Sequence, residues 1–235
     1  MNETIIDGSI ARAGSAAYHV VWAASNAIID GFTISGGVAN GGGNWREYGG
    51  GINAPYQSPA IVNCTFTNNW ALYGGGLYTR SSSVSVDNCV FKDNDTDNYG
   101  GGLLAESCSS LTVVNCILNS NTARYGGGIF DRSNPSSEFT NCTLYDNYAS
   151  QNGGAFYSDS GSSATIKNCI SWQNNSEIVS NGSTLAVTYS DVRGGYAGEG
   201  NFDLDPRFKD EASGNLSLLS ISPCIDMATA EGAPE

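Results

Sequence analysis

Apolar and polar residues alternate in short stretches of this chain, which is the two-residue period of β-strands. The stretch 83–91 reads Ser-Val-Ser-Val-Asp-Asn-Cys-Val-Phe, and its alternation shifts by one position at Asp87-Asn88. The apolar residues on both sides of the shift can face one interior if the chain turns a corner there. The repeated units contain no apolar stripe at helical spacing, so the pattern predicts short strands joined by corners.

The corner recurs at a nearly constant interval. Asn-Cys pairs are separated by 25, 27, 26 and 27 residues and begin at Asn63, Asn88, Asn115, Asn141 and Asn168. A glycine cluster follows the same interval, at residues 49–51, 74–76, 100–102, 126–128 and, as Asn-Gly-Gly, 152–154. Such a period indicates stacked units that bury a core only through their neighbours.

Short strands, corners and this period predict an all-β fold, a single-stranded right-handed parallel β-helix (solenoid) of about 8–9 coils. Asn suits the corners because it tolerates left-handed backbone angles. We expect one domain over 1–235, with N-terminal coils and a loop insertion in 1–48, regular repeats in 49–178, and the last coil and a C-terminal cap in 179–235.

The chain is acidic, with 23 Asp and Glu against 10 Lys and Arg and a net charge of −13. This charge repels phosphate backbones, so nucleic acid is not an expected partner. The most apolar run, 20–29, is too short for a membrane span. The first residues do not read as a signal peptide, so we expect a piece of a longer exported chain. Its expected location is extracellular or at the cell surface, with signal and anchor absent from this chain.

Five of the seven cysteines share one column of the repeat. Neighbouring strands lie about 4.8 Å apart, whereas the Cβ atoms of a disulfide lie roughly 3.5–4.5 Å apart. The pattern therefore favours a ladder of buried free thiols. Whether the two remaining cysteines, Cys108 and Cys224, pair is left open.

The repeats resemble a known group. Phe-Thr-Asn-Asn at 66–69 followed by Gly-Gly-Gly-Leu at 74–77, and the equivalent residues 91–94 and 100–103, resemble the repeats of the chlamydial polymorphic outer-membrane proteins. The tail 203–226 looks like the closing segment of secreted right-handed β-helix proteins of the pectate-lyase-like superfamily. The resemblance implies a β-helix in a cell-surface setting, with adhesion or surface display as its role.

Aromatic residues flank the glycine clusters in two columns. Tyr48, Tyr73, Tyr99 and Tyr125 precede the glycines, and Tyr78, Phe130 and Phe156 follow them. An insertion at 36–47 adds Trp45 beside the first tyrosine. If either column faces solvent, its rings form a surface for a polysaccharide or a surface protein. The alternative is internal stacking that seals a corner of the solenoid.

Charged residues offer two further candidates. Asp93, Asp95 and Asp97 can converge on calcium, as in carboxylate-rich loops, or form a solvated acidic turn. Arg80, Glu106 and Arg132 occupy equivalent places on successive coils. They predict a cross-strand ladder of alternating charge, although an arginine there would also serve a lyase. No other cofactor is expected. The single histidine, His19, lies in an apolar context and is expected to be packed rather than catalytic.

These observations favour a noncatalytic cell-surface or secreted module, adhesive or stalk-like, that binds glycan along its aromatic side. The first alternative is a polysaccharide lyase or glycoside hydrolase acting on an acidic polysaccharide, although no catalytic residue stands out. The second alternative is a subunit of an extracellular fibre, because the open strand edges of a β-helix can recruit another chain. Both a monomer and end-to-end self-association are therefore considered.

Overall fold

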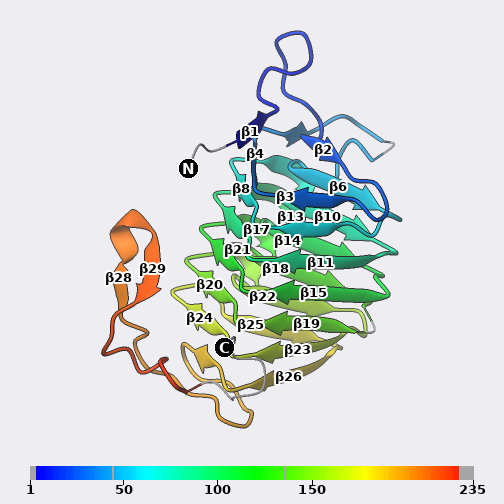
Figure 1. Cartoon of the computed structure of the whole chain (residues 1–235). Coiled ribbons are helices and arrows are strands. Elements are labelled where there is room, and N and C mark those ends of the chain that lie inside the picture. The colour runs from blue at the N-terminus through cyan, green and yellow to red at the C-terminus, as the bar shows by residue number, and fades with distance from the viewer. Residues whose placement is uncertain (1–3, 44, 135, 228–235) are drawn as a thin grey trace.

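The computed structural model describes residues 4–43, 45–134 and 136–227, which form a parallel β-helix (Figure 1). Each regular coil contributes one strand to each of four parallel sheets that run along the axis. The strands pair with those of the coils before and after them, in constant register in the first three sheets and with register shifts in the fourth. The predicted all-β class is confirmed, and the only helical element described is the short 3-10 helix η1 (Glu211–Ser213).

The four sheets are defined by their strands. The first sheet contains β2 (Val21–Trp22), β6 (Ile52–Pro55), β10 (Leu77–Arg80), β14 (Leu103–Glu106), β18 (Ile129–Arg132), β22 (Phe156–Asp159) and β25 (Ile178–Asn181). The second contains β3 (Ile28–Asp30), β7 (Ala60–Val62), β11 (Ser83–Asp87), β15 (Ser110–Val114), β19 (Ser137–Thr140), β23 (Ser163–Lys167) and β26 (Thr184–Thr188).

The third sheet contains β1 (Thr4–Asp7), β4 (Phe32–Ser35), β8 (Thr65–Thr67), β12 (Val90–Lys92), β16 (Ile117–Asn119), β20 (Thr143–Tyr145), β24 (Ile170–Trp172) and β27 (Asp191–Val192). The fourth contains β5 (Val38–Ala39), β9 (Trp70–Tyr73), β13 (Asp95–Tyr99), β17 (Thr122–Tyr125) and β21 (Tyr148–Asn152). Seven strands in each of the first two sheets and eight in the third make the predicted coil number close to the observed one.

The Asn-Cys repeat forms the corner between the second and third sheets, as predicted. The corner asparagines have left-handed backbone angles, with φ of +53°, +50°, +55°, +56° and +55° at Asn63, Asn88, Asn115, Asn141 and Asn168. The cysteine after each corner is buried in the core, and all seven cysteines of the chain are free. The backbone N–H of Cys64 donates to the Sγ of Cys89 at 3.4 Å, and the same contact recurs between later coils.

A second asparagine column forms a buried amide ladder that the sequence analysis left without a role. Along it, each side-chain Nδ2 donates to the Oδ1 of the next member at 2.9 to 3.0 Å, through Asn69, Asn94, Asn121, Asn147 and Asn174. The ladder ends on a carboxylate, because Asn174 donates to Glu177 Oε2 at 2.6 Å. This ladder explains why the repeat requires Asn three positions after its buried aromatic or aliphatic residue.

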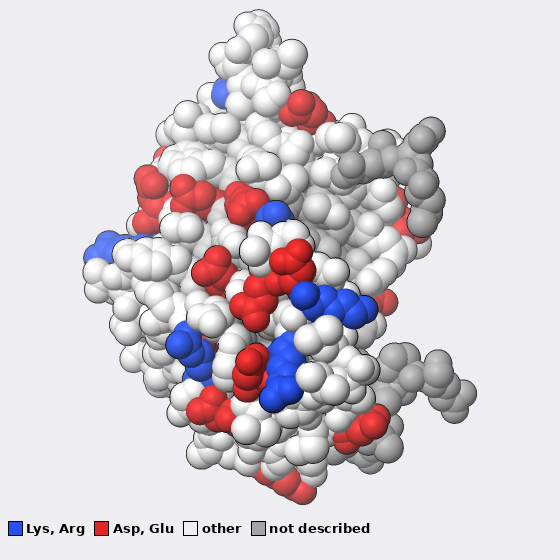
Figure 2. Space-filling model, turned by 90° about the vertical axis from the view of Figure 1, so that its left-hand side faces the viewer, with Lys and Arg blue, Asp and Glu red and all other residues white. Residues whose placement is uncertain are grey.

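The last coil is covered by the chain that follows it. Tyr189 donates its N–H to the carbonyl of Glu199 at 2.8 Å, and Val192 donates to the carbonyl of Phe202 at 3.0 Å. Beyond this cover, β28 (Phe208–Asp210) and β29 (Asn215–Leu218) form an antiparallel hairpin beside the solenoid (Figure 1). The face that carries the hairpin intersperses acidic with basic side chains (Figure 2).

Candidate functional site

The strand register places one column of outward-pointing side chains along the first sheet. From the N-terminal end it contains Trp22, Asn53, Tyr78, Leu104, Phe130, Tyr157 and Val179. These residues alternate with core residues, so they point away from the interior. Nevertheless Tyr78, Leu104, Phe130 and Tyr157 are buried and form a small hydrophobic cluster of their own. We call this set the inner column.

A second column of rings covers the inner column. Tyr48, Tyr73, Tyr99 and Tyr125 are half-buried and lie where the fourth sheet ends; we call them the outer column. Tyr99 packs on Phe130 and Tyr125 packs on Tyr157, with ring centroids 4.7 and 5.3 Å apart. The inner column therefore stacks internally, and the outer column presents its remaining surface to solvent.

Glycines allow the two columns to meet, because the chain turns sharply between the fourth and first sheets. Gly100 has φ +68°, in the left-handed region. At Gly101 a Cβ atom would lie 2.5 Å from the carbonyl oxygens of Gly127 and Thr122. A side chain at this position would push neighbouring coils apart, so the glycine cluster permits the close contact between the inner and outer columns, which together we call the aromatic face.

Phe156 does not belong to the aromatic face, and its assignment as a ligand-binding residue needs correction. Phe156 pairs with Ile129 and lies in the main core, while Tyr157 pairs with Phe130 in the inner column. The reason is a one-residue slip, since Asn152 pairs with Tyr125 and the glycine cluster of this coil begins at residue 153. Aligning the coil on 152–154 therefore shifted the expected column by one residue.

Two adjoining pockets run beside the outer column. One, of about 260 Å³, is lined by Tyr48, Tyr73, Tyr99, Leu104, Glu106 and Arg132. The other, of about 210 Å³, is lined by Tyr99, Tyr125, Phe130, Tyr157, Asp159 and Asn181. Because Tyr99 lines both, the two pockets lie next to each other and form one site beside the outer column. We call it the aromatic groove.

The polar side of the groove is the predicted ladder of alternating charge. Arg80, Glu106, Arg132 and Asp159 are register partners on successive coils. The Glu106 carboxylate lies 3.9 Å from Arg80 Nε and 3.7 Å from Arg132 Nη1, which confirms the ladder. Glu106 also accepts a hydrogen bond from the Tyr78 hydroxyl at 3.1 Å. Burial raises the pKa of Tyr78 well above its usual value, so this phenol remains a neutral donor.

Trp45 lies at the N-terminal end of the aromatic face. Its ring is 5.5 Å from that of Tyr48 and 6.2 Å from that of Tyr78. Trp22, which the sequence analysis did not single out, is the register partner of Asn53 on the first sheet and is 52% exposed. The insertion between Trp22 and the first glycine cluster hid this register. The only histidine, His19, packs against Trp22 at 5.3 Å, and burial lowers its pKa.

The acidic turn is arranged differently from a calcium loop. Asp93, Asp95 and Asp97 are exposed, and Asp93 lies 3.8 Å from the ammonium of Lys92. Within the described ranges, no three His, Cys, Asp or Glu side chains are grouped closely enough to hold a metal ion. Calcium binding by these three residues stays a prediction without geometric support.

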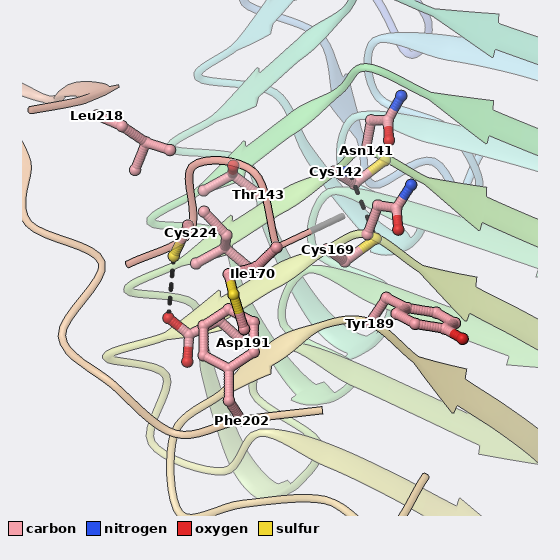
Figure 3. Close-up of a pocket in the computed structure, with 12 residues that line it drawn as sticks. Asn141, Cys142, Thr143, Cys169, Ile170, Tyr189, Asp191, Phe202, Leu218 and Cys224 are labelled. Atoms are coloured by element: carbon pink, nitrogen blue, oxygen red, sulfur yellow. Dashed lines mark hydrogen bonds between the residues drawn. The ribbon is translucent and has the colours of Figure 1, made fainter. Parts of the chain in front are cut away.

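A separate pocket of about 180 Å³ lies between the solenoid and the C-terminal tail (Figure 3). There Asp191 Oδ2 accepts from the thiol of Cys224 at 3.2 Å, and its Oδ1 accepts from the N–H of Leu204 at 3.1 Å. Burial raises the pKa of Asp191, and burial together with Asp191 raises that of Cys224 to about 12. A thiol with such a pKa is a poor nucleophile, so the geometry indicates an anchor for the tail.

A polar hollow of about 450 Å³ separates the hairpin from the third sheet, with Lys92, Asp93, Asp146 and Glu211 among its lining residues. Its aromatic residue, Tyr145, packs edge-on against Phe208 and donates its hydroxyl to Glu211 at 2.7 Å. Because this ring is already engaged, the hollow lacks the free aromatic platform that the aromatic groove offers.

A family model described as "Right handed beta helix region" matches residues 2–198. The chain belongs to this family, and the predicted right-handed β-helix is confirmed. The match bears on the fold alone, so the closer likeness to chlamydial polymorphic outer-membrane proteins stays a prediction. No curated protein and no solved structure matches the chain. None of the helices in the described part is long and apolar enough to cross a membrane.

Proposed function

We propose that this β-helix is a noncatalytic module of an extracellular or cell-surface protein that binds an extended glycan along the aromatic groove. The observation that best supports glycan binding is the partly exposed outer column. It packs on a buried inner column and is bordered by charged and amide side chains. Sugar rings combine an apolar face with hydroxyl groups, and this surface offers aromatic rings beside hydrogen-bonding groups.

The rigidity of the groove supports a binding role. Each tyrosine of the outer column packs on the ring of a neighbouring coil, so little side-chain entropy is lost when a ligand docks. Tyr99 lines both pockets, and a ligand that crosses it would contact three or four coils. A stalk built of stacked coils would display such a groove at a distance from its attachment point.

The contacts of Glu106 favour binding over catalysis. A general acid or base must exchange a proton with the substrate, whereas Glu106 lies between two arginines and accepts from the Tyr78 hydroxyl. Arg80 and Arg132 share this carboxylate, so each is partly neutralised. A lyase or hydrolase acting on an acidic polysaccharide is the alternative that the same experiment addresses.

The test is an array of neutral and acidic oligosaccharides, followed by calorimetry with the bound glycans and mass spectrometry of the incubated mixtures. Binding without cleavage is expected. Tyr99→Ala should weaken binding at least about tenfold, because it removes the ring shared by both pockets. Tyr148→Ala is the matched control, since Tyr148 is an exposed tyrosine outside the groove. Absence of any bound glycan, or release of shortened products, would overturn the proposal.

A further inference from the structure

The first sheet carries two buried polar atoms without hydrogen-bond partners on either side of Tyr78. Asn53, the register partner of Tyr78, is fully buried, and its Oδ1 accepts no hydrogen bond. The Nε of Arg80, two residues after Tyr78 on the same face, is buried and donates none. Its nearest carboxylate oxygen, on Glu106, lies 3.9 Å away, beyond hydrogen-bond distance. Such atoms are rare in native proteins and call for an explanation.

The amide of Asn53 is held in one orientation. Its Nδ2 donates to the carbonyl of Trp45 at 3.1 Å and lies 3.4 Å from Nε2 of His19. Nδ1 of His19 lies 3.2 Å from the carbonyl of Gly49 and donates to it, which leaves Nε2 as an acceptor. Rotating the amide would place Oδ1 against the carbonyl oxygen of Trp45. The unpartnered Oδ1 is therefore a fixed acceptor.

Trp45 contacts both residues, Asn53 through its backbone carbonyl and Arg80 through its ring, and its backbone is in a strained conformation. Its ring centroid is 5.8 Å from Cζ of Arg80, and its carbonyl is bound to Asn53. Trp45 has φ +68° and Tyr56, which packs edge-on against it, has φ +61°. Bulky side chains rarely occupy this left-handed region, and strain of this kind concentrates at functional sites.

We infer that Trp45 covers a terminal sugar subsite at the N-terminal end of the aromatic groove. With the indole displaced, Asn53 Oδ1 accepts a hydrogen bond from one sugar hydroxyl and Arg80 Nε donates to another, beside the exposed ring of Trp22. A hydroxyl group both donates and accepts, so neighbouring hydroxyls of one sugar satisfy the two atoms together. The inference rests on the proposed glycan-binding function and adds to it a subsite that Trp45 occupies in the unliganded protein.

Trp45→Gly is the variant of choice, because glycine adopts φ near +68° without strain and the protein should fold. The probes are single sugars, namely glucose, galactose, mannose and xylose. The readout is the side-chain amide resonance of Asn53, assigned by its absence in Asn53→Leu. In Trp45→Gly at least one sugar should shift this resonance saturably and bind about tenfold more tightly than to the wild type. The double variant Trp45→Gly/Asn53→Leu should lose the gain.

Trp172→Ala is the matched control, since Trp172 lies in β24 of the third sheet, outside the proposed subsite. It should bind no sugar more tightly than the wild type does. If none of the four sugars shifts the Asn53 resonance in Trp45→Gly, or if variant and wild type bind sugars with equal affinity, the proposed subsite is wrong. These outcomes are independent of the array, because failure of oligosaccharides to bind the wild-type groove would count against the proposed function only.

Discussion

Tyr99 lies against Phe130 with ring centroids 4.7 Å apart, so the ring shared by both pockets of the aromatic groove rests on a buried ring of the next coil. Phe130 is 2% exposed although it points away from the main core. The outer column, at the end of the fourth sheet, thus rests on the inner column of the first sheet as a second layer of side chains.

Phe130→Ala should destabilise the protein by about 3–5 kcal/mol, because it leaves a cavity beneath the outer column. Phe130→Leu should cost less than about 1.5 kcal/mol, since Leu104 already fills the equivalent place one coil earlier. Urea unfolding measures both. Cooperative unfolding of Phe130→Ala would show that this variant still folds. Its glycan affinity should then fall, because the outer column has lost its support. Unchanged stability in Phe130→Ala would show that the inner column is not a packed layer.

Glu177 should contribute to stability as the end of the amide ladder. Glu177→Ala removes the acceptor of one N–H of Asn174 and of the Ser171 hydroxyl, which should cost about 1–3 kcal/mol of unfolding free energy. Glu177→Gln keeps an acceptor oxygen and should cost less. The exposed Glu138 provides the control substitution to Ala, which should be nearly neutral. Equal stability of the Glu177→Ala and Glu138→Ala proteins would contradict this role.

Asp131 should make stability depend on pH. It is buried, its Oδ1 accepts from Asn134 and Ser137, its Oδ2 has no partner, and burial raises its pKa. The folded state then binds the proton more tightly than the unfolded state does. The contribution of Asp131 is therefore most favourable below the unfolded pKa, which is about 3.8, and is lost as pH rises through the folded pKa.

Asp131→Asn should remove this dependence. Its unfolding free energy should exceed that of the wild type at pH 7, by about 1–2 kcal/mol, and the difference should shrink toward pH 4. Urea titrations across this range measure the difference. The exposed Asp97→Asn is the control and should show no such gap. A variant that is less stable than the wild type at pH 7 would refute the assignment of Asp131 as a destabilising buried acid.

Asp191 should anchor the tail through Leu204 and Cys224. Asp191→Ala should expose the tail, so trypsin should cleave after Arg207 and Lys209 faster than in the wild type, while the solenoid stays intact. Mass spectrometry of the fragments follows the reaction. Cys224→Ser retains a donor toward Asp191 and should behave like the wild type. Equal cleavage rates for Asp191→Ala and the wild type would exclude the anchor.

The protein should remain monomeric in solution. At the C-terminal end, β27 and the corner before it are already paired with the segment that includes Glu199 and Phe202, so a second chain cannot extend the third sheet there. Light scattering across a concentration series should return the mass of one chain. A mass that rises with concentration would instead favour the fibre alternative.

Much of the fold could be read from the chain because each repeated residue has a local requirement. Asn63 and its equivalents must adopt left-handed angles, and Cys64 and its equivalents must fit a narrow buried site, so both recur at a fixed interval. The same logic predicted the ladder of Arg80, Glu106 and Arg132, because side chains at one register position lie next to each other on adjacent coils.

The sequence located the aromatic face but did not show which of its aromatic side chains are buried and which are exposed. Glycines carry no side chain that marks which neighbour points inward, so a slip of one residue in the coil at 152–157 assigned Phe156 to the wrong column in place of Tyr157. The sequence pattern did not place Trp22 on this face because an insertion separates it from its register partner Asn53. The burial of Tyr78 depends on Tyr48 and Trp45, which approach it only after the chain has turned.

The sequence by itself determined a right-handed solenoid with asparagine corners, a thiol column and an aromatic side, because these depend on contacts that repeat between one coil and the next. Tertiary structure alone decided that the outer tyrosines lie half-buried over a buried inner column, that Glu177 ends the amide ladder, and that Trp45 contacts Asn53 and Arg80. The reason is that these contacts depend on which side chains point inward after each glycine turn, and on residues such as Trp45 and Glu177 that do not recur in the repeat.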